Sequence, residues 1–212
     1  MPVLILASGS PRRRELLACL GLPFRVVVPH VDEDAPSAAD LTPEEMTEAL
    51  AGAKALTVAQ REGRGLVLAA DTLVVDGETV LGKPRDAGEA AAMLRRLCDR
   101  EHRVITGLAL VDAVRPDVSI LDHVTTMVRM RPYSEEEIAA YIASGEPFDK
   151  AGAYAIQDEM FHPVASYDGC YCNVVGLPLR AVVRLLQKGR LDITREHLAG
   201  LPPECANCPV EV

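Results

Sequence analysis

The sequence predicts an α/β protein, because apolar strand-like runs alternate along the chain with segments of helical pattern. The strand signal is clearest in residues 3–7 (VLILA) and 66–75 (LVLAADTLVV). Helix starts recur between such runs, each marked by a capping side chain: Ser10, Thr42, Asp86 and Ser134. The chain of 212 residues shows no internal repeat and no obvious linker, so we expect one domain.

The caps and the apolar runs set the expected limits of each element. Residues 144–176 carry too many glycines and polar groups to be mostly core, and residues 199–212, with three prolines, should be irregular. The expected elements are a strand at 3–7, a helix at 10–21, a strand at 24–29, a helix at 42–60, a strand at 66–75 with a turn at Asp76-Gly77, a helix at 86–97, strands at 103–114 and 118–130, and helices at 134–143 and 178–188.

The composition excludes several classes of protein. A net charge of −9 argues against a surface that wraps a nucleic-acid polymer, although a local basic cluster can still hold one nucleotide. No window reaches the roughly 18 unbroken apolar residues of a membrane span. The chain starts apolar and then turns basic, the reverse of a secretory signal, so we expect a cytoplasmic protein whose six cysteines are reduced by default.

The segment from Ser8 to Arg13 (SGSPRR) joins the first strand to a helix. Helix N-termini bind phosphate through exposed N–H groups and the positive end of the helix dipole. Consecutive helical residues point about 100° apart, so two of three neighbouring arginines can face a ligand there. We expect Arg12 and Arg13 to do so and Arg14 to point elsewhere. A solvated basic first turn is the alternative, but cations at this end oppose the dipole.

Two acidic features are candidates for metal binding or proton transfer. Asp71 lies inside the apolar strand 66–75, where a carboxylate is costly to bury unless it is paired or metal-bound. Glu33 belongs to an acidic run, Asp32 to Asp34, just after a strand. With Asp71, this run could hold Mg²⁺ or Mn²⁺, which prefer oxygen ligands. A turn-capping aspartate and a solvated acidic loop are the alternatives.

Two further positions could contact a nucleotide. Lys83 lies between a glycine and a proline, so a constrained backbone could aim its ammonium at a phosphate. The spacing of a Walker A loop is absent, and an exposed turn lysine is the alternative. In residues 149–157 (DKAGAYAIQ), small residues alternate with larger ones, and the Gln157 amide could pair with a base edge. A tight structural turn is the alternative.

Six segments in fixed order resemble the Maf family, also called septum-formation inhibitor proteins: LASGSPRRRELL, AADTLVV, GKPRDA, VITGLAL, DKAGAYAIQ and NVVGLPL. The resemblance implies a nucleoside triphosphate pyrophosphatase of inosine triphosphatase-like fold. That fold is α/β, with a mixed central sheet, flanking helices and two lobes around a nucleotide cleft. It further implies one catalytic domain over residues 1–190, a C-terminal tail over 191–212 and a homodimer.

The resemblance also implies roles for individual residues. Asp71 matches the catalytic proton acceptor and, with Glu33, the divalent metal site. The implied substrate-binding residues are Ser8, Ser10, Arg12, Arg13, Lys54, Thr72, Lys83 and Gln157. In this chemistry Asp71 takes a proton from a water that attacks the α-phosphorus, and pyrophosphate leaves.

The segment KAGAYAIQ is similar to the branch of the family that acts on dTTP and UTP, with CTP and modified pyrimidine triphosphates as further substrates. The alternatives are the branch directed at 7-methyl-GTP and a non-catalytic, nucleotide-binding regulator of cell division.

Four cysteines depart from the family's pattern. Cys170 and Cys172 are spaced C-x-C, where the family commonly has a Gly-Ser-Tyr run, and Cys205 and Cys208 are spaced C-x-x-C in the tail. Four thiolates would suit a structural zinc ion. Free thiols and a disulfide are the alternatives.

Overall fold

The computed structural model describes residues 3–31, 41–205 and 208–209. Its strands are β1 (Leu4–Ala7), β2 (Phe24–Val26), β3 (Leu66–Asp76), β4 (Thr79–Leu81), β5 (Glu101–Asp112), β6 (Ser119–Met130) and β7 (Val164–Asp168). Its helices are α1 (Pro11–Ala18), α2 (Pro43–Glu62), α3 (Ala87–Leu97), α4 (Glu135–Ala143), α5 (Tyr171–Val175), α6 (Leu179–Lys188) and α7 (Arg195–Ala199), with 3-10 turns η1 (Glu146–Asp149), η2 (Ala151–Ala153) and η3 (Pro203–Cys205).

Within the described residues, seven strands form one mixed sheet in the order β2-β1-β3-β5-β6-β7, with β4 also paired to β3. The strands β2, β1 and β3 run parallel, and the remaining pairs are antiparallel. The predicted α/β fold with a mixed central sheet is therefore confirmed.

Alternation along the strands distributes the core between the two faces of the sheet. Ile5 and Val67 point to the face covered by α2, where they pack with Ala51 and Ala55. Because side chains alternate along a strand, Leu4, Leu6 and Leu68 point to the other face, which α1 and α6 cover. None of the described helices combines the length and the apolar character of a membrane span.

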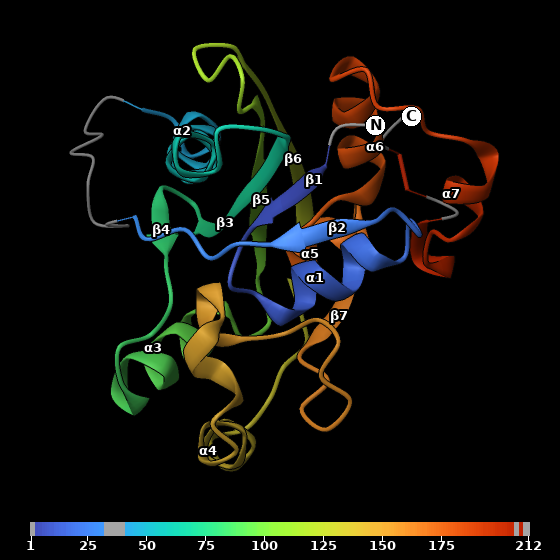
Figure 1. Cartoon of the computed structure of the whole chain (residues 1–212). Coiled ribbons are helices and arrows are strands. Elements are labelled where there is room, and N and C mark those ends of the chain that lie inside the picture. The colour runs from blue at the N-terminus through green and yellow to red at the C-terminus, as the bar shows by residue number, and fades with distance from the viewer. Residues whose placement is uncertain (1–2, 32–40, 206–207, 210–212) are drawn as a thin grey trace.

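A second hydrophobic cluster lies toward the other end of the sheet, where Val74, Val104 and Val128 meet residues of α3 and α4, such as Leu94 and Tyr141. Figure 1 shows α3 and α4 together below the region of α1, α2 and α6. The molecule thus has two lobes that share the long strands of the sheet.

Two segments with weak sequence patterns behave as expected. Most of residues 144–176 are exposed or half-buried, so the segment is not mostly core, although some of its residues are. Tyr154 and Phe161 pack in the cluster of the α3–α4 lobe, while Cys170 and Cys172 pack in the core beside α1 and α6. The described residues after 199 are largely irregular, as expected, because α7 ends at Ala199 and only η3 follows it. These elements are short, with five and three residues, so they leave little periodicity to read in the sequence.

Candidate active site

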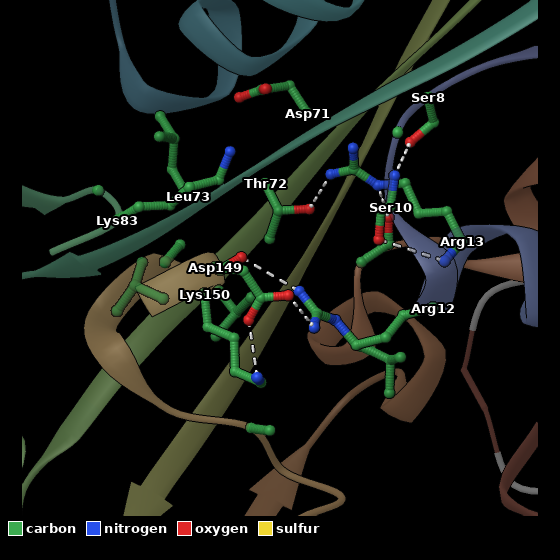
Figure 2. Close-up of a pocket in the computed structure, with 18 of the residues that line it drawn as sticks. Ser8, Ser10, Arg12, Arg13, Asp71, Thr72, Leu73, Lys83, Asp149 and Lys150 are labelled. Atoms are coloured by element: carbon green, nitrogen blue, oxygen red, sulfur yellow. Dashed lines mark hydrogen bonds and ion pairs between the residues drawn. The ribbon is translucent and has the colours of Figure 1, made fainter. Parts of the chain in front are cut away.

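A cavity of about 960 Å³ lies between the two lobes, near the upper end of the roughly 300–1,000 Å³ that small-molecule sites occupy. Figure 2 shows part of its wall. Glu33 falls outside the described residues. The other residues expected to bind substrate or to act in catalysis all line the cavity: Ser8, Ser10, Arg12, Arg13, Lys54, Asp71, Thr72, Lys83 and Gln157.

The cavity opens beside a bare edge of β3. The strand β1 pairs with β3 up to Ala7 opposite Ala69, and β4 joins β3 only from Val74 onward. On that side, no described strand pairs with β3 at residues 70–73. An edge without a partner strand exposes backbone N–H and C=O groups, so this stretch can hydrogen-bond a ligand. Asp71 and Thr72 lie within it.

The loop after β1 is held by its own serines. The N–H of Ser10 donates to Ser8 Oγ at 3.1 Å, and the N–H of Arg13 donates to Ser10 Oγ at 3.4 Å. Pro11 has no N–H, so few donors of this helix end remain for an anion. Each serine oxygen accepts from the backbone, which leaves its O–H able to donate to a phosphate oxygen.

Arg13 is fixed by a chain of hydrogen bonds that crosses the sheet. Its Nε donates to Gly176 O at 2.8 Å, and its terminal nitrogen donates to Thr72 Oγ1 at 3.0 Å. Thr72 and Thr106 share a hydrogen bond of 2.9 Å, and Thr106 donates to Asn173 O at 3.1 Å. The chain therefore runs in one direction and orders the guanidinium at the cavity wall.

Arg12 is held from the opposite lobe. It donates to the Asp149 carboxylate at 2.8 Å and to the Asp149 carbonyl at 3.2 Å, and Lys150 donates to the same carboxylate at 2.7 Å. Partial burial would raise the pKa of Asp149, but the hydrogen bonds from Lys150 and Arg12 hold it below its ordinary value. Arg14 is exposed and is not among the cavity's lining residues.

Asp71 forms a buried ion pair on the other face of β3. Lys54 Nζ of α2 donates to Asp71 Oδ1 at 2.6 Å, and the two residues are only 7% and 9% exposed. This pair requires α2 to lie close to the sheet. Gly107 of β5, paired with Asp71, permits that approach, because a Cβ there would lie 2.3 Å from the carbonyl carbon of Thr47.

The oxygen atoms around Asp71 bear on whether a divalent cation can bind there. The Asp71 carboxylate is an oxygen ligand on the cavity wall, and Mg²⁺ is commonly held by one or two carboxylates plus substrate phosphates. Within the described parts of the chain, no three His, Cys, Asp or Glu side chains form a preformed metal site. The residues present thus fit a cation that is completed by substrate oxygens.

Lys83 and Gln157 lie at the exposed rim of the cavity, after β4 and after η2 respectively. Sequence reasoning did not give Asp149 and Gly176 roles in the site. Asp149 is 137 positions from Arg12, so no local pattern connects them. Gly176 acts through its backbone carbonyl, which leaves no side-chain signal.

Comparison with known proteins gives consistent matches. The family model described as Maf-like protein matches residues 3–189. A protein of Thermomicrobium roseum named dTTP/UTP pyrophosphatase is 53% identical over 207 residues, which cover 98% of this chain and 93% of the relative. A protein of Symbiobacterium thermophilum with the same name is 52% identical over 187 residues, covering 88% and 93% respectively.

Among solved structures, a HAM1 protein from Coxiella burnetii matches with a TM-score of 0.45 and 18% identity, over 61% of this chain and 73% of that one. The family model spans nearly the whole chain, and the two relatives are about half identical to it. The chain belongs to the Maf family.

Proposed function

We propose that the protein is a nucleoside triphosphate pyrophosphatase that hydrolyses dTTP and UTP to the monophosphate and pyrophosphate. The observation that carries this proposal is that a buried carboxylate, Asp71, and two anchored arginines, Arg12 and Arg13, line the same cavity beside the bare edge of β3. The names of the relatives from Thermomicrobium roseum and Symbiobacterium thermophilum support the substrate class.

The basic residues suit a triphosphate, which carries about four negative charges. Arg12, Arg13 and Lys83 line the cavity, and charge-assisted hydrogen bonds from such groups to phosphate are among the strongest in proteins. Because Arg13 is already ordered by Gly176 and Thr72, it can stabilise developing charge without reorganising during the reaction.

In this proposal Asp71 acts as the proton acceptor. A water molecule beside it would attack the α-phosphorus, Asp71 would take the water's proton, and pyrophosphate would leave. Lys54 orients the carboxylate through Oδ1, so that Oδ2 can face the water. Mg²⁺ or Mn²⁺, when held by Asp71 and by Glu33 from outside the described residues, would neutralise phosphate charge.

In this proposal, groups at the exposed rim of the cavity and along the bare edge of β3 recognise the nucleotide base. Gln157 supplies an amide with both donor and acceptor atoms, which suits the edge of a pyrimidine. CTP and modified pyrimidine triphosphates belong to the same proposal as further substrates. The homodimer and the cytoplasmic location stay predictions, and light scattering of the purified protein tests the first.

The test is pyrophosphate release from a panel of triphosphates, with Mg²⁺ or Mn²⁺ and then with a chelator. We expect metal-dependent turnover of dTTP and UTP above purine triphosphates. Preference for 7-methyl-GTP would overturn the base assignment and leave the chemistry intact. Binding without any turnover would overturn the enzyme and favour a regulator.

The same assay tests Asp71 through Asp71→Asn, which keeps an oxygen for Lys54 but cannot take the proton. We expect kcat to fall by roughly 10²–10⁴-fold, the usual contribution of a positioned base. Asp117→Asn is the matched control, because Asp117 is exposed and does not line the cavity. Near-normal turnover by folded Asp71→Asn would show that Asp71 is not the proton acceptor.

A further inference from the structure

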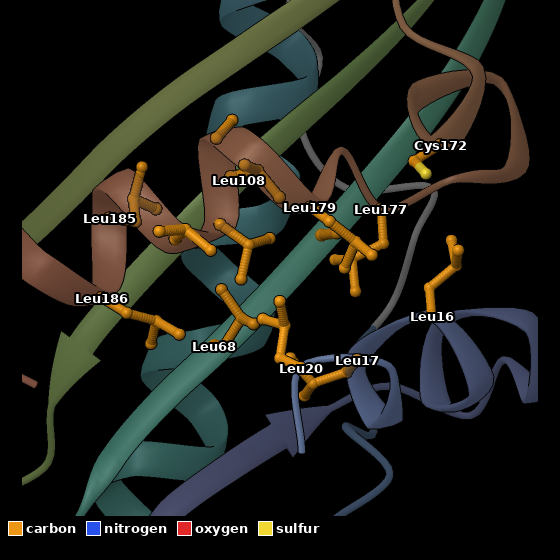
Figure 3. Packing of buried hydrophobic residues seen from close by; sticks show 14 of the residues in the cluster. Leu16, Leu17, Leu20, Leu68, Leu108, Cys172, Leu177, Leu179, Leu185 and Leu186 are labelled. Atoms are coloured by element: carbon orange, nitrogen blue, oxygen red, sulfur yellow. The ribbon is translucent and has the colours of Figure 1, made fainter. Parts of the chain in front are cut away.

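Four of the six cysteines lie together, away from the cavity. Cys170, Cys172, Cys205 and Cys208 are 1%, 0%, 1% and 7% exposed and belong to one hydrophobic cluster. Figure 3 shows Cys172 in this cluster, with Leu177 and Leu16 nearby. The nucleotide chemistry uses none of these thiols.

A direct sulfur–sulfur contact joins the two motifs. The Sγ atoms of Cys172 and Cys205 are 3.0 Å apart. The thiols of Cys172 and Cys208 are near enough to that of Cys170 to lower its pKa. Thiols more than 30 positions apart in sequence have thus been brought into direct contact.

Local backbone bonds orient both pairs. Cys170 precedes α5, and its N–H donates to Thr126 Oγ1 at 3.0 Å while its carbonyl accepts from the same hydroxyl at 3.2 Å. In the tail, the N–H of Cys208 donates to the carbonyl of Cys205 at 3.2 Å. These bonds hold the two cysteines of each motif close together.

We propose that Cys170, Cys172, Cys205 and Cys208 bind a single structural zinc ion that joins the tail to α5. Four cysteines are a common donor set for structural zinc, and they close the coordination sphere without an open position for a substrate. The apolar surroundings exclude water from such a site. On binding, the thiol protons pass to the buffer, because zinc takes thiolates as ligands.

One cation and one anion lie near the proposed zinc–thiolate centre, and they act on it in opposite senses. Four thiolates and one Zn²⁺ carry a net charge of −2, which needs a nearby cation. The guanidinium of Arg180 in α6 is close enough to Cys205 to attract negative charge on that sulfur, whereas Glu204 acts in the opposite sense. Arg180 is thus the cation that offsets part of the charge.

Among the described residues, no group of three or more His, Cys, Asp or Glu is already arranged to hold a metal ion, so zinc binding requires the sulfurs to move. With Zn–S bonds of about 2.3 Å, sulfurs at tetrahedral corners are about 3.8 Å apart. The Cys172–Cys205 pair, at 3.0 Å, must therefore open by less than about 1 Å. The short turn η3 that carries Cys205 can supply this movement.

The position of the zinc ion has a consequence for the cavity. The carbonyl of Cys172 accepts the N–H groups of Gly176 and Leu177 at 3.1 and 2.9 Å, and the carbonyl of Gly176 accepts from Arg13. Fixing Cys172 therefore helps fix the carbonyl that anchors Arg13. The four cysteines act as positioning residues, apart from the chemistry at Asp71.

The test is the metal content of the full chain, purified without chelator and measured by mass spectrometry of the elements. We expect one zinc per chain, released with an organomercurial that titrates thiolates. Replacement by Co²⁺ should give the absorption of tetrahedral thiolate ligation. In native protein, only the two cysteines outside the cluster, Cys19 and Cys98, should react with a thiol reagent, and six should react after denaturation with chelator.

Variants assign the ligands. Cys208→Ser should lower zinc content by at least tenfold, while Cys19→Ser and Cys98→Ser, matched controls outside the cluster, should keep one zinc per chain. If Cys208→Ser fails to fold, metal analysis and chelator titration of the unmodified chain still decide the matter. A raised KM for dTTP in zinc-depleted protein, freed of chelator and assayed with added Mg²⁺, with kcat little changed, would mark the link to Arg13.

Two outcomes would overturn the proposal. Zinc far below one per chain, with all thiols reactive in denaturant alone, would show a cluster of free thiols. Thiols that stay blocked in denaturant with chelator, until a reductant is added, would show a disulfide. Either result leaves the pyrophosphate assay untouched, because that assay reports on Asp71 and the arginines.

Discussion

At the scale of single residues, Asp149 holds Arg12 through both its carboxylate and its carbonyl. The carboxylate is negative where the phosphates of a substrate would lie, so it offsets part of the attraction of Arg12. Asp149→Asn keeps a hydrogen-bond acceptor and removes that charge. We expect KM for dTTP to fall by a few-fold, corresponding to less than about 1 kcal/mol, because Asp149 is largely exposed and its charge is screened.

The measurement is steady-state kinetics at low and moderate salt, and the gain should shrink as salt rises. Glu146→Gln is the matched control, since Glu146 also pairs with Lys150 but does not contact Arg12. An unchanged or higher KM in Asp149→Asn would mean that the carboxylate orients Arg12 more than it opposes the substrate.

Single residues also show what the sequence can and cannot predict. The angular spacing of helical residues predicted that one of three arginines would point away, and position nearest the helix N-terminus favoured Arg12 and Arg13 as the other two. The structure places Arg14 outside the cavity wall. The cost of burying a charge predicted a partner for Asp71, and that partner is Lys54. The role of Gly176 could not be predicted, because a backbone carbonyl is present at every position.

At the scale of elements, the contact of α2 with β5 decides where Lys54 lies. A Cβ at Gly107 would lie 2.3–2.5 Å from backbone atoms of Thr47 and Glu48. Backbone cannot rotate away, so Gly107→Ala must displace α2 from the sheet. We expect a loss of about 1–3 kcal/mol of stability from overpacking, with lower kcat because the Lys54–Asp71 pair is stretched. Urea unfolding and the pyrophosphate assay measure the two effects.

Gly52→Ala, in the middle of α2, is the matched control. Its Cβ would lie at an ordinary 3.6 Å from Leu121, and alanine is favoured over glycine in a helix by roughly 0.5–1 kcal/mol. This variant should be equally active and slightly more stable. If Gly107→Ala is as stable and active as the unmodified chain, α2 can move away from the sheet without loss of stability or of the Lys54–Asp71 pair.

Elements with strong local signals were predicted well. The caps expected at Ser10, Thr42, Asp86 and Ser134 are all present, and the last three each precede a helix of nine residues or more. The strand β7 and the helix α5 were not expected. β7 is a largely exposed strand of five residues, and α5 begins without a side-chain cap. Their placement comes from contacts with β6 and the core, which local sequence does not encode.

At the scale of the whole molecule, a chain of net charge −9 encloses a cavity with a strongly basic wall. The negative net charge and the basic wall are compatible because cations far apart in the sequence come together only on folding. Arg12 and Arg13 follow β1, and Lys83 follows β4. Such focusing raises the local concentration of an anionic substrate. Overall charge predicts poor binding of nucleic-acid polymers but cannot locate a single-nucleotide site.

Folding also ties the stability of the whole molecule to pH, through His102. This histidine of β5 is 2% exposed, and its Nε2 is hydrogen-bonded to Tyr154 Oη at 2.7 Å. Its Nδ1 is buried and has no hydrogen-bond partner among the described residues, so a proton there would be unsatisfied. Burial lowers the pKa of His102 to about 4, although Asp76 opposes the shift.

Because the unfolded chain binds this proton near pH 6.5 and the folded chain only near pH 4, the folded state loses stability as pH falls through that window. Between pH 8 and pH 5 the loss from this group should be about 2 kcal/mol. Urea unfolding at both pH values measures it as the difference between the unmodified chain and His102→Gln, which does not titrate. His162→Asn, at an exposed histidine, should retain the full pH dependence. If His102→Gln loses as much stability between the two pH values as the unmodified chain, acid sensitivity arises in the carboxylates and the His102–Tyr154 bond has no part in it.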